Sequence, residues 1–178
     1  MSARSTLGAT VRHMTLRVGV LFPDSDTAAV ERFRAQWDPI AAHVPAHVTV
    51  AFPFDDDRDI DDLAREFRIA MTGMAAFTVE LETPTAWEDE YVFLLATQGA
   101  AEITALHNAL YQGPLLGQPR PAQFTPHMTV GRTGEVVLAV AAAQAVKLAM
   151  RGLVRAISIY RVEPKGRREI EVHLPLVD

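Results

Sequence analysis

Short apolar segments rich in β-branched residues alternate along this chain with longer segments in which apolar residues recur every three or four positions. The first pattern predicts β-strands and the second predicts amphipathic α-helices. Their mixture along the whole length predicts an α+β fold. Strands are expected over residues 11–22, 46–54, 76–82, 91–97, 127–131, 154–162 and 170–176, and helices between residues 26 and 43, 60 and 71, 99 and 113, and 135 and 150.

A loop without regular structure is predicted before the strand at 127–131. Residues 113–126 contain two glycines and four prolines, which interrupt helices and strands alike. Loops of this length in a compact domain are often functional. A second, basic turn over residues 165–168 joins the last two predicted strands.

One arrangement occurs twice: a helix, a short strand that begins His-x-Thr-apolar, and a second helix. The two copies lie 80 residues apart, close to half the length of the chain. This spacing predicts two lobes of similar plan within one domain that covers residues 1–178. A third match, which begins at His13, is interpreted as structural or incidental. The two copies that carry the argument are His47-Val48-Thr49-Val50 and His127-Met128-Thr129-Val130.

The alternation of a strand gives each copy a polar face and an apolar face. His47 and Thr49 project to one side, and Val48 projects to the other. If the lobes pack with their polar faces toward each other, two imidazoles and two hydroxyls converge on one small cavity that fits a phosphate. A neutral imidazole can take a proton from water while a protonated one gives a proton to the leaving oxygen. Threonine hydroxyls can hold the phosphoryl oxygens, so this chemistry requires no metal.

The two motifs and their surroundings, HVTVAFPF and TPHMTVGR, resemble the signature motifs of the two-histidine (2H) phosphoesterase superfamily. The branch they resemble is described as 2′-5′ RNA ligase-like or cyclic phosphodiesterase proteins, and the resemblance covers residues 15–176. It implies a bilobal, LigT-like α+β fold. Such a fold has two pseudo-symmetric lobes of antiparallel sheet, helices on the outside and a central cleft that holds both motifs.

The resemblance also implies an activity. It points to a hydrolase that opens 2′,3′-cyclic phosphates of RNA ends or nucleotides, with 2′-5′ RNA ligation or RNA and nucleotide binding without turnover as alternatives. His47 and His127 become the acid/base pair, and Thr49 and Thr129 become phosphate ligands. Arg132 follows the second motif where related proteins carry a basic residue that meets substrate. Strict alternation would turn it away from Thr129, although Gly131 permits a bulge.

Two residues of the predicted loop are further candidates for substrate binding. The ring of Phe124 could stack on a nucleobase and the guanidinium of Arg120 could meet a phosphate. The alternative for Phe124 is a hydrophobic anchor that holds the loop to the core. For a polynucleotide substrate, the basic turn at 165–168 and Arg155 or Arg161 are possible phosphate contacts.

Composition narrows the class of protein. The chain has 178 residues, a net charge of −5 and no cysteine, which excludes disulfide scaffolds, thiolate metal sites and cysteine nucleophiles. Residues 1–112 carry 8 basic and 17 acidic residues, whereas residues 113–178 carry 9 and 5. Either an anionic ligand meets the C-terminal part, or this is ordinary surface variation. With no membrane-length apolar run and no secretory signal, a cytoplasmic monomer without membrane partners is expected.

The remaining acidic and histidine residues give a weak case for a metal site. Carboxylates over residues 55–62 are interpreted as a solvated helix start, because they favour the positive end of a helix dipole. They lack the spacing and central glycine of a calcium loop. His43, His107 and His173 are interpreted as structural residues, so neither a metal nor another cofactor is expected.

Overall fold

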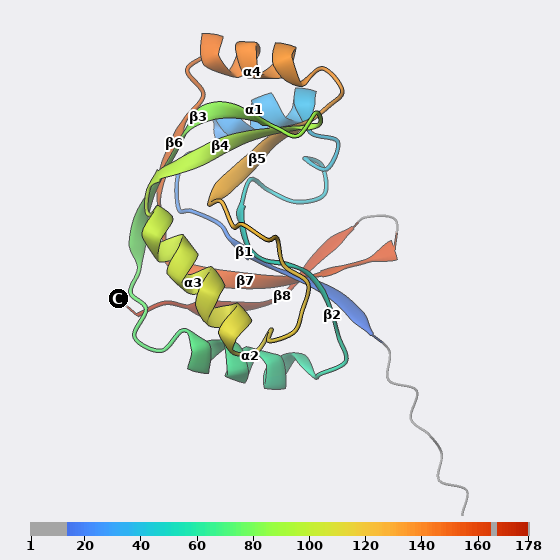
Figure 1. Ribbon diagram of the computed structural model, residues 1–178, viewed down its shortest axis with the longest axis vertical. Coiled ribbons are helices and arrows are strands. Elements are labelled where there is room, and N and C mark those ends of the chain that lie inside the picture. The colour runs from blue at the N-terminus through green and yellow to red at the C-terminus, as the bar shows by residue number, and fades with distance from the viewer. Residues whose placement is uncertain (1–13, 165–166, 178) are drawn as a thin grey trace, which may run out of the picture.

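The computed structural model describes residues 14–164 and 167–177, so His13 and Lys165 lie outside the described residues. Strands and helices follow one another in the mixed order that the sequence predicts (Figure 1). The strands are β1 (Thr15–Leu21), β2 (Val48–Asp56), β3 (Phe77–Trp87), β4 (Tyr91–Gln98), β5 (His127–Arg132), β6 (Met150–Val154), β7 (Ala156–Val162) and β8 (Arg168–Pro175). The helices are α1 (Ala28–Trp37), α2 (Ile60–Ala70), α3 (Ala100–Gln112) and α4 (Val136–Ala145).

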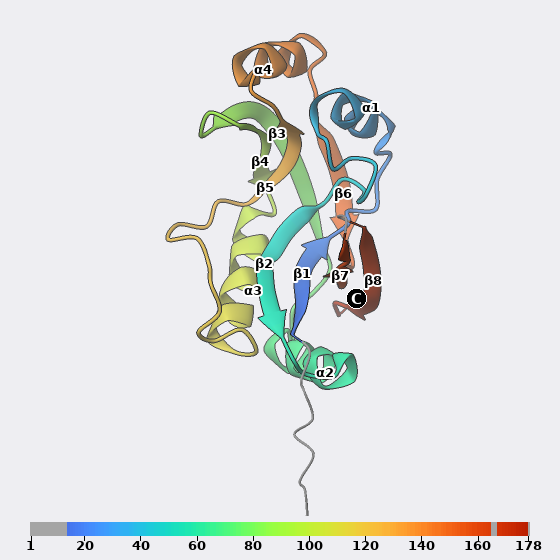
Figure 2. The same cartoon turned by 90° about the vertical axis from the view of Figure 1, so that its right-hand side faces the viewer.

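A single curled sheet joins the eight strands found in the described ranges, in the order β6-β3-β4-β5-β2-β1-β7-β8. Neighbouring strands pair antiparallel, and the halves β6-β3-β4-β5 and β2-β1-β7-β8 meet where β5 lies beside β2 (Figure 1, Figure 2). At that junction Val48 pairs with Met128, whereas longer ladders join the strands within each half. The sheet therefore has the two-lobed α+β form that the resemblance implies.

Two helices cover each half of the sheet, and in each pair one helix comes from a segment that connects two strands of the other half. Helix α1 connects β1 to β2 but packs on β5, and α3 connects β4 to β5 but packs on β2. Helices α4 and α2 pack on β3 and β8, so the two pairs lie at opposite ends of the molecule (Figure 1). Because each half needs a helix from the other half's segment, the two halves share one hydrophobic core.

The prediction of one helix over residues 135–150 is wrong at its C-terminal end. Helix α4 ends at Ala145, and Lys147 has a positive φ of 50°, a conformation that terminates helices. The chain then forms β6 at the edge of the sheet, beside β3. Met150 and Val154 of β6 are buried and Arg151 is exposed. The alternation of buried and exposed residues in this short strand is hard to recognise in the sequence, because it directly follows an alanine-rich segment that predicts a helix.

Strand β3 also differs from its prediction, because it does not turn at residues 83–85. The register shifts between Glu82 and Pro84, and Thr83 has a φ of 59°. These features are those of a β-bulge, which bends a strand without ending its pairing. The strand continues to Trp87, which pairs with Tyr91.

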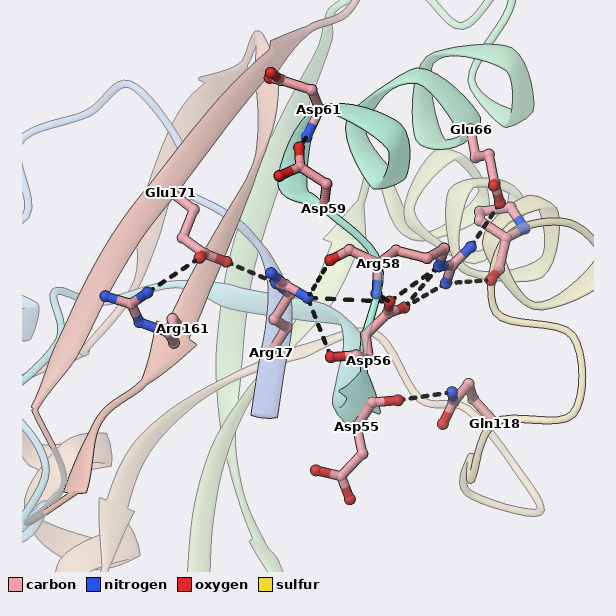
Figure 3. Close-up of polar contacts among 11 residues, drawn as sticks. Arg17, Asp55, Asp56, Arg58, Asp59, Asp61, Glu66, Gln118, Arg161 and Glu171 are labelled. Carbon is pink, nitrogen blue, oxygen red and sulfur yellow. Dashed lines mark hydrogen bonds and ion pairs between the residues drawn. The ribbon is translucent and has the colours of Figure 1, made fainter. Parts of the chain in front are cut away.

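Charged side chains form a network at the end of β2 that lies away from the motif (Figure 3). Arg17 is 5% exposed and donates from Nε to Glu171 at 2.7 Å and from Nη1 to the backbone carbonyl of Asp56. The Asp56 carboxylate accepts from Arg58, which also donates to the carbonyl of Pro114 at 3.0 Å. The network therefore ties β1, β2 and β8 to the start of the loop at 113–126.

Replacing Asp56 with alanine is expected to lower the free energy of unfolding by about 3 kcal/mol, because it leaves the buried Arg17 and its neighbour Arg58 without this partner. Burial raises the pKa of Asp56, but the hydrogen bonds and charge of Arg58 and the charge of Arg17 outweigh it and lower the pKa. Stability from this carboxylate is therefore present above its ordinary pKa of 3.8 and is lost as the pH falls through the lowered value.

Urea unfolding at pH 7 and at pH 3 measures this contribution. Asp62→Ala is the matched control, since Asp62 pairs with Arg65 on an exposed face of α2 and should change stability by only about 0.5 kcal/mol. Equal losses for the two variants at pH 7 would contradict the assigned role of Asp56.

Candidate active site

The His-x-Thr motifs line a cavity of about 400 Å³ at the junction of the two halves of the sheet. His47, which immediately precedes β2, and Thr49 come from one half, and His127 and Thr129 of β5 come from the other. Aromatic residues of β3, β4 and β7 complete much of the wall. The structure thus brings together all four residues that the sequence proposes as the catalytic set.

The register between β2 and β5 fixes how these four residues face one another. Antiparallel pairing of Val48 with Met128 places His47 across from Thr129 and Thr49 across from His127. Val48 and Met128 are fully buried in the core on the other side of the sheet, and the motif residues are half-buried on the cavity side. The polar faces therefore lie side by side on neighbouring strands, and the expectation that they confront each other from two packed lobes is wrong.

Both motif histidines make the same hydrogen bond to their own backbone. His47 Nδ1 lies 2.7 Å from the carbonyl oxygen of Pro45, and His127 Nδ1 lies 2.6 Å from that of Thr125. Because a carbonyl only accepts, each Nδ1 carries the proton and donates. In the neutral ring Nε2 is then an unprotonated acceptor. Each imidazole is therefore oriented to exchange protons at Nε2.

Both imidazoles favour the neutral form. Burial lowers the pKa of His47 to about 4, with further lowering by the charges of Arg34 and Arg168 and partial compensation by the Pro45 carbonyl and Asp38. Burial also lowers the pKa of His127, against the hydrogen bond to Thr125. Charged side chains contribute to the pKa shift of His47 but not to that of His127, so the two histidines are electrostatically different.

An aromatic wall, made of Trp87, Tyr91 and Phe93, borders His127. The Phe93 ring stacks on the His127 ring with centroids 3.6 Å apart and planes 21° apart. The Trp87 ring stacks on the Phe93 ring with centroids 5.6 Å apart, and the centroid of the Tyr91 ring lies 5.9 Å from that of Phe93. Sequence reasoning missed this wall because its residues are adjacent only after β3 passes the bulge and pairs with β4.

The ring of His47 has different neighbours, which the sequence analysis also did not identify. The rings of Phe22 and Tyr160 make edge-to-face contacts with it, and their centroids lie 6.0 and 6.2 Å from that of the imidazole. The guanidinium of Arg168 lies 5.7 Å from the centre of the Tyr160 ring and lines the cavity. Arg168 was proposed only as part of the basic turn, and its place beside the motif depends on the pairing of β7 with β8.

Arg132 lines the cavity as expected. The register of β5 against β4 shifts between the pairs Val92–Gly131 and Phe93–Thr129, which inserts one extra residue into β5. This bulge overrides strict alternation and turns Arg132 to the cavity. Its guanidinium pairs with Glu90 and lies 5.5 Å from the centre of the Tyr91 ring.

Phe124 and Arg120 do not line the cavity. The Phe124 ring stacks on His107 at 3.9 Å with nearly parallel planes and contacts Phe52 edge-on, which matches the alternative of a loop anchor. The guanidinium of Arg120 lies 5.9 Å from the centre of the Tyr111 ring. Other loop residues line the cavity instead, namely Pro121, Gln123 and Thr125.

The remaining candidates take part in structural contacts. His107 Nδ1 bonds to the carbonyl of Val50, and His173 bonds to Ser158. Arg155 and Arg161 form ion pairs outside the cavity. Asp59 caps α2 by accepting from the backbone N–H of Asp61. Across the described ranges, no three histidine or acidic side chains are grouped as metal ligands, and none of the helices there is long and apolar enough to cross a membrane.

Comparison with known proteins agrees with this geometry. The model of the 2′-5′ RNA ligase superfamily matches residues 22–165, which include both motifs. The chain belongs to this superfamily of 2H phosphoesterases. A Bacillus licheniformis protein named "Putative phosphoesterase" is 28% identical to this chain over 116 residues, which are 64% of this chain and 68% of that protein.

Solved structures show the same superfamily fold. Escherichia coli LigT complexed with 3′-AMP superposes with a TM-score of 0.64 at 17% identity and covers 93% of this chain and 100% of its own. The complex of the same protein with ATP gives a TM-score of 0.58 at 17% identity with the same coverage. The two-lobed fold implied by the motif resemblance is therefore confirmed.

Proposed function

We propose that this protein is a metal-independent phosphodiesterase that hydrolyses 2′,3′-cyclic phosphates of nucleotides or RNA ends. One observation carries the proposal: His47 and His127 lie on the cavity side of adjacent strands, each with Nδ1 bonded to the carbonyl two residues before it. This arrangement supplies two Nε2 atoms to one ligand, and each strand adds a threonine hydroxyl. A cyclic phosphate needs one proton acceptor and one proton donor on its two sides.

We assign the roles of the two histidines from their electrostatic difference. Burial, together with the charges of Arg34 and Arg168, disfavours positive charge on His47, so in this proposal His47 is the neutral base and His127 is the acid. His47 Nε2 takes a proton from the attacking water as the new P–O bond forms. His127 Nε2–H gives its proton to the ribose oxygen as the P–O bond to that oxygen breaks. The product is a phosphomonoester, and each histidine must exchange a proton with solvent before the next cycle.

The other cavity residues suit a nucleotide. Hydroxyls of Thr49 and Thr129 can donate to the non-bridging phosphoryl oxygens, and Arg132 can contribute positive charge at the cavity edge. The aromatic wall beside His127 offers a surface on which a nucleobase can stack. A nucleotide is also what E. coli LigT carries in its complex with 3′-AMP. Phe124 and Arg120 are not included, because they lie outside the cavity.

Incubation of the protein with nucleoside 2′,3′-cyclic phosphates in excess chelator tests the proposal. We expect phosphomonoester to form at a rate that chelator does not reduce. RNA halves that end in a cyclic phosphate and a 5′-hydroxyl, tested in parallel, would reveal 2′-5′ ligation as joined product. Nucleotide binding without any product from either substrate would contradict catalysis and leave a binding module.

The lowered pKa values predict an acidic pH optimum. The productive free enzyme has neutral His47 and protonated His127. Its fraction rises as the pH increases through the His47 pKa of about 4 and falls as the pH increases through the His127 pKa, which lies below 6.5. We therefore expect a bell-shaped profile of kcat/KM with its maximum below pH 6.5, measured with circular dichroism at each pH as a check on folding. A maximum at pH 7 or above would contradict this assignment.

A further inference from the structure

We propose that Glu31 is a positioning residue for His47 and acts on it through the peptide group between Pro45 and Ala46. In this role the Glu31 carboxylate fixes the carbonyl that orients the imidazole and stabilises positive charge on the ring when His47 takes a proton. The inference rests on the proposed function for its catalytic consequence, but the contact itself is independent of turnover.

Both polar atoms of a single peptide group are engaged in this contact. The backbone N–H of Ala46 donates to Glu31 Oε1 at 2.5 Å. The carbonyl of Pro45, on the opposite edge of the same peptide plane, accepts from His47 Nδ1 at 2.7 Å. An amide that donates to a carboxylate is polarised and becomes a stronger acceptor at its oxygen. The chain from carboxylate to imidazole is therefore continuous, with one peptide group between them.

Buried groups on α1 hold Glu31 in place. Its second oxygen, Oε2, accepts from Arg34 Nη1 at 3.0 Å. Arg34 is 1% exposed and also donates to Asp38 Oδ2 at 2.9 Å and to the carbonyl of Val44 at 3.1 Å. Arg34 and Glu31 thus bind the backbone of Val44 and Ala46, on either side of Pro45. Two residues of α1 therefore fix the position of the carbonyl that orients the His47 ring.

His127 has no equivalent support. Its Nδ1 bonds to the carbonyl of Thr125, but the next residue is Pro126, whose nitrogen carries no hydrogen. The peptide group behind His127 therefore has no donor for a carboxylate, and its orientation is fixed by the proline ring and by the bond from the Ala96 N–H to the Pro126 carbonyl. The two histidines share their backbone bond, yet only His47 has an anion behind it.

This asymmetry fits the role of a base. A base becomes positively charged in the transition state, so an anion about one peptide group away lowers the cost of that charge. The effect opposes the charges of Arg34 and Arg168, which face His47 from α1 and β8. The other titratable groups that face it are Asp38, at the C-cap of α1, Tyr160 of β7 and His127 of β5.

Two substitutions separate position from charge. Glu31→Gln keeps an oxygen that can accept from the Ala46 N–H but removes the negative charge and the acceptor for Arg34, which keeps its bonds to Asp38 and to the Val44 carbonyl. Glu31→Ala removes the oxygen for Ala46 as well. We expect Glu31→Gln to move the acidic limb of the kcat/KM profile to lower pH by about half a unit or more and to lower kcat by about 3- to 10-fold. KM should stay within about twofold, and the alkaline limb, set by His127, should not move.

Nitrogen-15 NMR of the imidazoles in the free protein at pH 7 provides a readout that needs no turnover. Wild type and Glu31→Gln should hold His47 in the Nδ1–H tautomer, and Glu31→Ala should populate the second tautomer while His127 is unchanged. Glu102→Ala, at an exposed position of α3, is the control and should match wild type.

The outcomes distinguish the two proposals. An unchanged His47 tautomer and an unchanged acidic limb in Glu31→Ala would overturn the role of Glu31 even if the enzyme is active. The tautomer change without any phosphodiesterase activity in wild type would support the contact and refute the proposed function.

Discussion

Alanine at either motif histidine is expected to reduce kcat for hydrolysis of a nucleoside 2′,3′-cyclic phosphate by about 10³-fold. In the proposed mechanism His47→Ala removes the proton acceptor for water, and His127→Ala removes the donor to the leaving oxygen. The two rings line one cavity from adjacent strands, and in the proposed mechanism they act on one phosphoryl group. We therefore expect the double variant to lose little more activity than either single variant, because a reaction already deprived of one partner gains little from the other.

Initial rates at saturating substrate, measured at the pH optimum, check this expectation. His43→Ala is the matched control, because His43 is exposed and does not line the cavity; its kcat should equal that of wild type. Thermal unfolding establishes that each variant is folded. If His47→Ala and His127→Ala hydrolyse the substrate as fast as the control, the paired-histidine mechanism is wrong.

The sequence was sufficient to predict the motif residues because their geometry is local. Strand alternation alone separates His47 and Thr49 from Val48, and the structure buries Val48 and leaves the other two on the cavity side. The same parity holds for His127 and Thr129 on either side of Met128. A repeat half a chain apart then predicted two similar lobes, and the division of the curled sheet agrees with it.

Features that depend on strand order and register were beyond the sequence. Nothing in the sequence around residue 48 indicates that it pairs with residue 128. The two motifs were therefore expected to face each other from separate lobes, whereas they lie side by side on adjacent strands. The aromatic wall requires β3 to continue past its bulge at Thr83. The contact of Glu31 could not be predicted because its partner is a backbone N–H fifteen residues away. Every residue except proline has such a group, so the residue types do not indicate which one Glu31 binds.

Phe124 shows the opposite case, a residue that is a candidate for substrate binding by composition but whose ring makes structural contacts. An aromatic residue in a proline-rich loop before the motif has the composition of a base-stacking position. The loop, however, passes over α3, where the face of His107 is available and takes the ring. Such competition between a ligand and a nearby ring depends on distance in space, which the sequence does not specify.

Valine at Thr49 or Thr129 is expected to lower kcat/KM by about 10- to 100-fold for each substitution. Valine keeps the shape and the strand preference of threonine but cannot donate a hydrogen bond. Bonds to a charged group contribute about 1.5 to 3 kcal/mol, and the charge on the phosphoryl oxygens increases in the transition state. Because Thr129 lies across from His47 and Thr49 across from His127, we expect comparable losses at the two positions.

Thr97→Val provides the matched control, since Thr97 is exposed on β4 and bonds to Glu82 outside the cavity. Its kcat/KM should stay within about twofold of wild type. The pH at which kcat/KM is maximal should not move in Thr49→Val or Thr129→Val, because neither hydroxyl supplies the transferred proton. A shift of that optimum, or a loss as large as that of His127→Ala, would mean that a threonine takes part in proton transfer and that the division of roles between imidazoles and hydroxyls is wrong.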